Sequence, residues 1–337
     1  MYHARMCAVT RRSVVKQVGF AGAGFLLEPV TIRGQGAPIT IAGRAAEIAV
    51  APISASTVRI TVQAVIGSVA QSVVNHGALV PAAEARATMR WRESVEPVRS
   101  GDFTVRFTPG VSPLIAIERA GRVVQTLRLS STEPVIQFGL GQGHIFGLGE
   151  GGPQFDRKGH TFGTRNGQGG YQLRTHGGRV QIQWLVSTDG WGMYVHQPLG
   201  AFDLTGAEGT LTPTGDALPL DVFVVASPDP KVIIGEYARI TGFAELPPLW
   251  SLGYMQSHRT LAGPDEISWV ARTFREKQLP CDALIYLGTE FTPSGWNTRN
   301  GEFAWKPENF PNPKQFIDEM HAQHYKVVLH VVKKAAE

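Results

Sequence analysis

Cysteine, long apolar runs and charged side chains are all scarce in this chain. The 337 residues include two cysteines, Cys7 and Cys281, and Cys7 lies in an N-terminal segment expected to be cleaved, so no intrachain disulfide is expected in the mature chain. The apolar run near the N-terminus, residues 18–27, is about ten residues long and too short to span a membrane. Charged residues make up 18% of the chain and form no basic stripe interleaved with aromatic residues, which argues against a nucleic-acid partner.

Several chemical motifs are missing as well. The glycine-rich stretch 147–152 lacks the lysine and the serine or threonine of a phosphate-binding loop. No Gly-x-Ser-x-Gly nucleophile elbow occurs. His321 and His324 are three residues apart, but no third ligand is spaced to join them. The sequence therefore predicts neither a metal site nor a cofactor.

The net charge of +4 is concentrated at the N-terminus. Residues 1–37 contain five basic residues and one acidic residue, whereas the remainder has 27 of each. Arg11 and Arg12 precede the apolar run, and small residues follow at 34–37, an order typical of a twin-arginine export signal. A frayed helix with chance arginines is the alternative. We expect an exported protein, periplasmic or extracellular, that has no membrane contact after cleavage of residues 1–37. In that protein Cys281 is expected to be a small buried hydrophobe.

Short β-runs dominate residues 38–245. Residues 57–62, 103–107 and 180–184 alternate apolar and polar side chains, which predicts strands with one buried and one wet face. The whole segment is expected to form one antiparallel β-sandwich. Residues 149–178 are an exception, with ten glycines in thirty residues. A loop of this length is usually functional, and Arg165 and Asn166 lie in it; a surface excursion is the alternative.

Residues 246–337 alternate strands and helices. A helix is predicted over 230–241, and the pair Pro247 and Pro248 marks a domain boundary. Strands are then predicted at 252–255, 283–287 and 326–332, with one helix opening at Pro264 and another capped by Asn312. This pattern is the beginning of a parallel (β/α)8 barrel, and 92 residues supply three of its strands at most.

Working residues of such a barrel lie where the strands end. Tryptophans, amides and a carboxylate near one mouth suit a sugar, whose apolar face stacks on an indole while its hydroxyls need directional partners. A place in the core is the alternative for His330 and for either tryptophan. The candidates for substrate contact are Gln256, His258, Glu290, Trp296, Asn297, Trp305 and His330.

An ordered series of motifs resembles glycoside hydrolase family 31. It comprises 146–150 (FGLGE), 190–194 (GWGMY), 247–257 (PPLWSLGYMQS), 309–314 (NFPNPK) and 326–330 (KVVLH). The resemblance covers roughly residues 134–332. It implies a galactose-mutarotase-like β-sandwich followed by the first three β/α units of a TIM (β/α)8 barrel. It also implies retaining hydrolysis of O-glycosyl bonds by an α-glucosidase or α-xylosidase, with an oligosaccharide or glycoside as substrate.

The resemblance also implies where the catalyst lies. The family uses an aspartate nucleophile after strand four and an aspartate acid after strand six, so both are expected beyond Glu337 and no catalytic residue can be named here. Where the family has Asp-x-Asp-Tyr at strand two, this chain has 287–291 (LGTEF), so that the first aspartate falls on Leu287 or Gly288. Arg165 and Asn166 stand about where a further aspartate is common in a loop that reaches over the barrel mouth.

Three interpretations follow. In the first, the chain is the N-terminal portion of an exported α-glycoside hydrolase and is inactive alone. In the second, it is a carbohydrate-binding protein that has lost catalysis. In the third, the sandwich is a structural or interaction module. Nothing in the sequence points to a particular oligomeric state.

Overall fold

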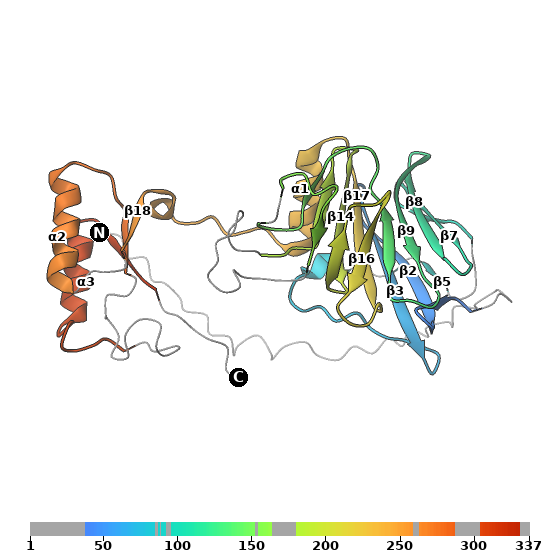
Figure 1. The fold of residues 1–337 in the computed structure, drawn as a ribbon, viewed down its shortest axis with the longest axis horizontal. Coiled ribbons are helices and arrows are strands. Elements are labelled where there is room, and N and C mark those ends of the chain that lie inside the picture. The colour runs from blue at the N-terminus through green and yellow to red at the C-terminus, as the bar shows by residue number, and fades with distance from the viewer. Residues whose placement is uncertain are drawn as a thin grey trace, which may run out of the picture. The chain divides into compact units, whose positions relative to one another are not determined.

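The computed structural model describes residues 38–84, 87, 89–91, 96–151, 154–163, 180–258, 263–286 and 304–330. The chain forms two compact units, Met1–Gly242 and Phe243–Glu337 (Figure 1). The sequence placed this boundary between residues 245 and 246. The predicted leader, residues 1–37, lies outside the described residues.

The first unit contains two antiparallel sheets. The nine-stranded sheet has the order β1 (Thr40–Ile41), β2 (Arg44–Ser54), β3 (Thr57–Ile66), β17 (Leu220–Ala226), β14 (Trp191–Gln197), β13 (Trp184–Ser187) and β11 (Ile145–Gly147), with β4 (Val69–Ala70) on β3 and β5 (Met89–Trp91) on β2. The eight-stranded sheet has the order β12 (Thr161–Phe162), β15 (Gly200–Asp203), β16 (Glu208–Pro213), β10 (Ile136–Gly139), β9 (Arg122–Leu129), β8 (Leu114–Arg119), β7 (Phe103–Thr108) and β6 (Val98–Ser100).

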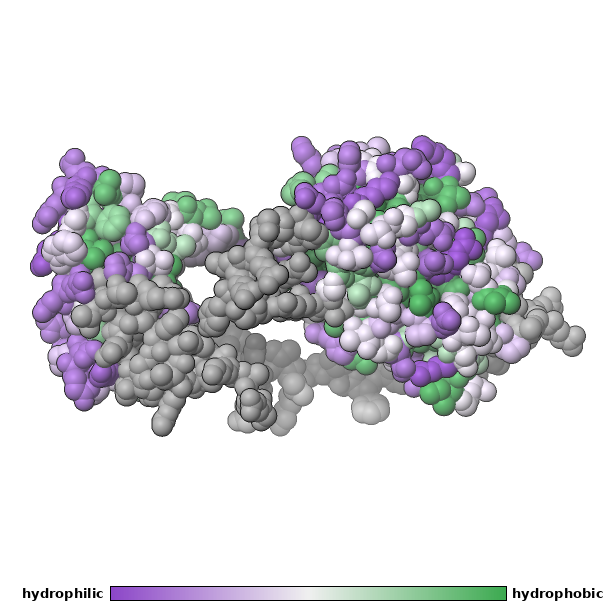
Figure 2. Space-filling view, viewed as in Figure 1, coloured by the Kyte–Doolittle hydropathy of each residue, from purple (hydrophilic) through white to green (hydrophobic). Residues whose placement is uncertain are grey.

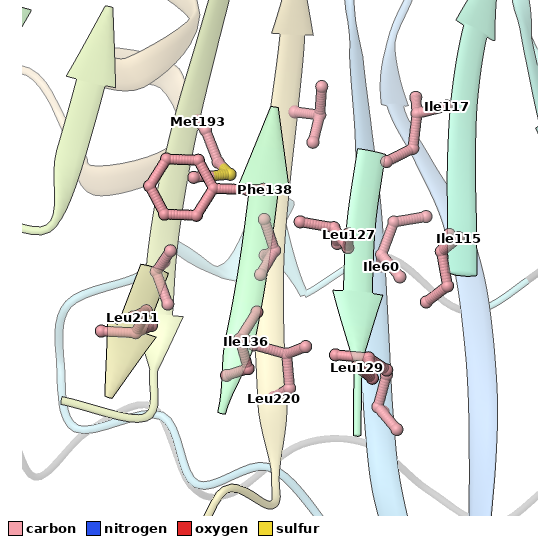
Figure 3. Packing of buried hydrophobic residues seen from close by; sticks show 14 of the residues in the cluster. Ile60, Ile115, Ile117, Leu127, Leu129, Ile136, Phe138, Met193, Leu211 and Leu220 are labelled. Carbon is pink, nitrogen blue, oxygen red and sulfur yellow. The ribbon is translucent and has the colours of Figure 1, made fainter. Parts of the chain in front are cut away.

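One apolar core joins the two sheets. On β7, Phe103, Val105 and Phe107 are buried while the residues between them are not, as the alternation predicted. Figure 3 shows such side chains filling the space between the layers, among them Ile60 and Leu220 of one sheet and Leu127 of the other. The predicted β-sandwich is therefore present in the described residues.

The predicted helix over 230–241 is confirmed as α1 (Pro230–Thr241). Asp229 caps it by accepting a hydrogen bond from the Lys231 amide at 2.8 Å, and Pro230 occupies the first turn, where its missing N–H costs nothing. Ile233 and Ile240 pack on the outer face of the nine-stranded sheet, with the 3-10 turn η1 (Pro81–Ala83) beside them. Because α1 covers β17 from outside, all seven residues of that strand are buried.

The second unit contains a parallel sheet in the order β18 (Met255–His258), β19 (Ala283–Tyr286) and β20 (Lys326–Leu329). Helices α2 (Pro264–Glu276) and α3 (Pro313–Ala322) connect the strands. Both helices begin at the predicted prolines, and Asn312 Oδ1 accepts a hydrogen bond from the Gln315 amide at 3.2 Å. No helix among the residues described in either unit is both long and apolar enough to cross a membrane.

Two predicted strands are misplaced. Residues 249–252 form a 3-10 turn, η2 (Leu249–Leu252), because the Ser251 amide bonds back to the Pro248 carbonyl at 2.9 Å; the first parallel strand starts only at Met255. Residues 180–183 form an isolated bridge between Val180 and Glu150 and no strand. Here the Gln183 side chain donates to the carbonyls of Val195 and Pro198, both at 2.9 Å, and so replaces ladder hydrogen bonds.

Candidate functional site

The three parallel strands end together at one edge of their sheet. His258 pairs with Tyr286, and Tyr286 pairs with Leu329. The His330 amide continues the ladder, since it donates to the Tyr286 carbonyl at 3.1 Å. The structure thus brings His258 and His330 to the same edge, as expected for the carboxyl ends of parallel strands.

The register assigns these side chains to opposite faces. Leu284, Tyr286, Val327 and Leu329 belong to the core shared with α2 and α3, so their row faces the helices. Gln256 and His258 are in register with Leu284 and Tyr286 and belong to the helix-side row. Side chains alternate along a strand, so the opposite row consists of Ser257, Ile285 and Val328 and leads on to His330.

Gln256 makes local hydrogen bonds with both ends of its amide. Its Oε1 accepts from the Tyr254 hydroxyl at 2.5 Å, and its Nε2 donates to the Ser257 carbonyl at 2.7 Å. Substrate contact through this side chain would have to replace one of these bonds.

The opposite ends of the strands are fixed by Arg275. Its Nε donates to the Gln323 carbonyl at 3.1 Å and its Nη2 to the Cys281 carbonyl at 2.9 Å, while the guanidinium lies 3.8 Å from the Tyr325 ring centroid. The Tyr325 hydroxyl donates to the Ala271 carbonyl at 2.9 Å. Cys281 is 4% exposed, and burial raises the pKa of its thiol, so the predicted buried hydrophobe is confirmed.

The remaining candidates divide into two groups. Trp305 is half-buried beside Phe310, with ring centroids 5.0 Å apart, and packs against the core of the second unit. Glu290, Trp296, Asn297, Arg165 and Asn166 lie outside the described residues.

The base of the predicted loop at 149–178 is ordered by a residue that sequence reasoning passed over. Arg157 is 8% exposed and donates to the carbonyls of Gly147 at 2.9 Å, Gln154 at 2.6 Å and Gly149 at 3.2 Å. Its guanidinium also lies 5.1 Å from the Phe162 ring centroid. The signal available in the sequence was an arginine within a glycine-rich stretch, because buried backbone carbonyls need hydrogen-bond donors.

Asp156, next to Arg157, binds the same segment. Its Oδ1 accepts from the amides of Ile145 and Lys158, both at 3.1 Å, and its Oδ2 lies 2.6 Å from His144 Nδ1. Desolvation acts to raise the pKa of Asp156, but the hydrogen bonds from His144 and the two amides outweigh it and hold that pKa below its ordinary value.

Comparison with known proteins identifies the second unit. Residues 244–336 match the model of the glycosyl hydrolases family 31 TIM-barrel domain. This part of the chain belongs to glycoside hydrolase family 31. The match includes all three parallel strands and both of their helices.

Two curated relatives match less than half of the chain. An alpha-xylosidase of Saccharolobus solfataricus is 30% identical over 154 residues, which are 45% of this chain and 20% of the relative. Alpha-glucosidase 2 of Bacillus thermoamyloliquefaciens is 33% identical over 127 residues, which are 38% of this chain and 15% of the relative. The matched segments thus span a fifth or less of the length of these relatives.

Solved family 31 structures share the fold over both units. A Flavobacterium johnsoniae dextranase in complex with isomaltotriose has a TM-score of 0.65 at 18% identity and covers 84% of this chain, which matches 36% of it. An alpha-xylosidase from a soil metagenome, in complex with xylose, has a TM-score of 0.61 at 19% identity and covers 87% of this chain, which matches 45% of it. The family resemblance stated from the motifs is confirmed.

Proposed function

We propose that the protein to which this chain belongs is an α-glycoside hydrolase of the α-glucosidase or α-xylosidase type. The observation that carries the proposal is the family 31 match over residues 244–336, where three parallel strands bring their carboxyl ends to one edge. In a barrel that edge is where substrate binds.

The mechanism we propose is retaining double displacement. One carboxylate forms a covalent glycosyl-enzyme and a second carboxyl group, about 5 Å away, protonates the leaving oxygen and then activates water. We further propose that neither group is among these 337 residues, so that this chain alone does not hydrolyse glycosides. Its own contribution is to binding and positioning.

His330 is the described candidate best placed to contact the sugar. Helices surround the outside of a (β/α)8 barrel, so the row that faces away from α2 and α3 would face the barrel interior. His330 follows Val328 in that row, whereas Gln256 and His258 belong to the helix-side row. Gln256 and His258 would then support the strand ends and not touch the sugar directly.

A carbohydrate-binding protein without catalysis is the second candidate. It is favoured by 287–291 (LGTEF), where the aspartate expected to bind sugar hydroxyls is replaced by Leu287 or Gly288. Loss of a charge-assisted hydrogen bond costs about 1.5–3 kcal/mol unless Glu290 supplies it.

Hydrolysis assays with aryl α-glucoside and aryl α-xyloside test the proposal. The 337-residue chain should show no turnover, and measurable hydrolysis would contradict the absence of the catalytic pair. The protein encoded by the complete gene should release the sugar with its α configuration, as observed by NMR. His330→Ala in that protein should lower kcat/KM, with His321→Ala as the matched control, because His321 is exposed on α3. Sugar binding without hydrolysis would favour the second candidate.

A further inference from the structure

Three aromatic side chains form a row at one edge of the sandwich. The ring centroids of His144 and Phe146 are 6.3 Å apart, and those of Phe146 and Phe155 are 5.3 Å apart, with interplanar angles of 31° and 50°. Phe155 is 85% exposed, and the His144 side chain is 70% exposed. We call His144, Phe146 and Phe155 the aromatic row.

The strand order explains why the aromatic row is open to solvent. β11 is the last strand of the nine-stranded sheet; its Ile145 is fully buried in the core, so the neighbouring side chains His144 and Phe146 point outward. Helix α1 packs on β14 and β17, and β13 lies between β14 and β11. The helix therefore covers the middle of the outer face, and the row lies at its edge.

The polar part of the aromatic row is held in place before any ligand arrives. Asp156 is fixed by two backbone amides and in turn orients His144 through Nδ1, which leaves Nε2 on the far side of the ring. Arg157 fixes the backbone directly before Phe155 through the Gln154 carbonyl and ties it to the end of β11 through the carbonyls of Gly147 and Gly149. Preorganised side chains lose little conformational freedom on binding.

We propose that the aromatic row is a second sugar-binding site, formed by residues of the first unit alone. The apolar faces of successive pyranose rings would stack on Phe155 and Phe146, and a sugar hydroxyl would hydrogen-bond to His144 Nε2. A neutral polysaccharide fits better than a protein partner, because the apolar area is narrow and directly flanked by Asp156 and Lys158. The visible face of the sandwich likewise shows scattered, small hydrophobic areas (Figure 2).

The choice of an α-linked glucan or a xylose-bearing glucan as occupant rests on the proposed glycosidase function. The existence of the site does not depend on catalysis, because the aromatic row lies wholly within the first unit. Binding can therefore be measured with the 337-residue chain, and hydrolysis can be measured separately with the protein from the complete gene.

Affinity electrophoresis in gels that contain soluble starch, dextran or xyloglucan tests the site. The wild-type chain should be retarded by at least one of these polysaccharides, and Phe155→Ala should weaken the apparent affinity about tenfold. His144→Gln should weaken it less, since it leaves both phenyl rings in place. Phe243→Ala is the matched control, because Phe243 is 73% exposed but belongs to the second unit.

Each outcome decides the proposal. Retardation that Phe155→Ala weakens about tenfold and Phe243→Ala leaves unchanged supports the site. Equal retardation of both variants, or none for the wild type in any of the three gels, overturns it. If the wild type is not retarded in any gel, hydrolysis by the protein from the complete gene would still support the proposed function. Failure of the second site is therefore distinguishable from failure of the proposed function. Unchanged circular dichroism of Phe155→Ala excludes unfolding as the cause.

Discussion

Of the residues that form ion pairs in the sandwich, Asp221 is the one whose substitution should lower the free energy of unfolding most. It is fully buried on β17 and accepts hydrogen bonds from Arg59 Nε at 2.7 Å, Arg59 Nη2 at 2.9 Å and the Thr61 hydroxyl at 3.1 Å. His196 Nδ1 lies 2.8 Å from its second oxygen. His196 sits at a β-bulge between Val195 and Gln197, which aims its side chain at the carboxylate.

The network connects three adjacent strands and the turn η1. Arg59 lies on β3, Asp221 on β17 and His196 on β14, and Arg59 Nη1 also donates to the Ala83 carbonyl at 3.1 Å. Asp221→Asn leaves the guanidinium, 12% exposed, without a carboxylate partner. Removal of one member of a buried ion pair costs about 3–5 kcal/mol, which in a domain of this size lowers the melting temperature by roughly 6–20 °C.

Calorimetry and urea unfolding measure this effect. Asp216→Asn is the control, because its ion pair with Arg44 at 3.0 Å is open to solvent, with side chains 67% and 50% exposed. That variant should lose less than about 1 kcal/mol. If Asp221→Asn were destabilised no more than Asp216→Asn, the reasoning from burial would be refuted.

The same carboxylate makes sandwich stability depend on pH. Desolvation acts to raise the pKa of Asp221, but hydrogen bonds and charge from His196 and Arg59 outweigh it, so its folded-state pKa lies below the ordinary value. Its contribution to the free energy of unfolding is therefore complete above about pH 4 and is lost as the pH falls through the folded-state pKa. Wild type and Asp221→Asn should converge in stability over that acid range.

Three further outcomes follow from close contacts in the two units. In Gly149→Ala the new Cβ would lie 1.9 Å from the Val180 carbonyl oxygen. The control is Gly159→Ala, which has a similar positive φ and whose Cβ meets nothing within 4 Å. Urea unfolding should show that Gly149→Ala lowers the free energy of unfolding by about 1–3 kcal/mol more than Gly159→Ala does. Arg275→Lys should lower the stability of the second unit by about 1.5–3 kcal/mol, measured by hydrogen exchange. In a Cys7→Ser background, Cys281 should react with a thiol reagent slowly until urea is added; rapid native labelling would contradict its burial.

Local punctuation made the helices predictable. Pro230, Pro264 and Pro313 each open a helix, and the caps Asp229 and Asn312 bond to the first-turn amides as their side-chain chemistry requires. Alternation at residues 180–184 was misleading because a strand, unlike a helix start, does not depend on local residues alone. Strand formation needs a partner, and here a buried glutamine side chain takes the hydrogen bonds that a neighbouring strand would have supplied. The competing side chain is invisible to a pattern of apolar and polar residues.

The site residues show how a small error in a strand boundary changes a functional assignment. With a strand predicted at 252–255, Gln256 and His258 fell in a loop at the barrel mouth; with β18 at Met255–His258, they lie within the strand. Since side chains alternate, the pairing of His258 with Tyr286 decides which face each residue takes. β18 has four residues, and those at positions 256, 257 and 258 are all polar. The strand therefore contains no alternation of apolar and polar residues from which this register could have been predicted. Ser257 therefore belongs to the row that faces away from α2 and α3, whereas Gln256 and His258 belong to the helix-side row.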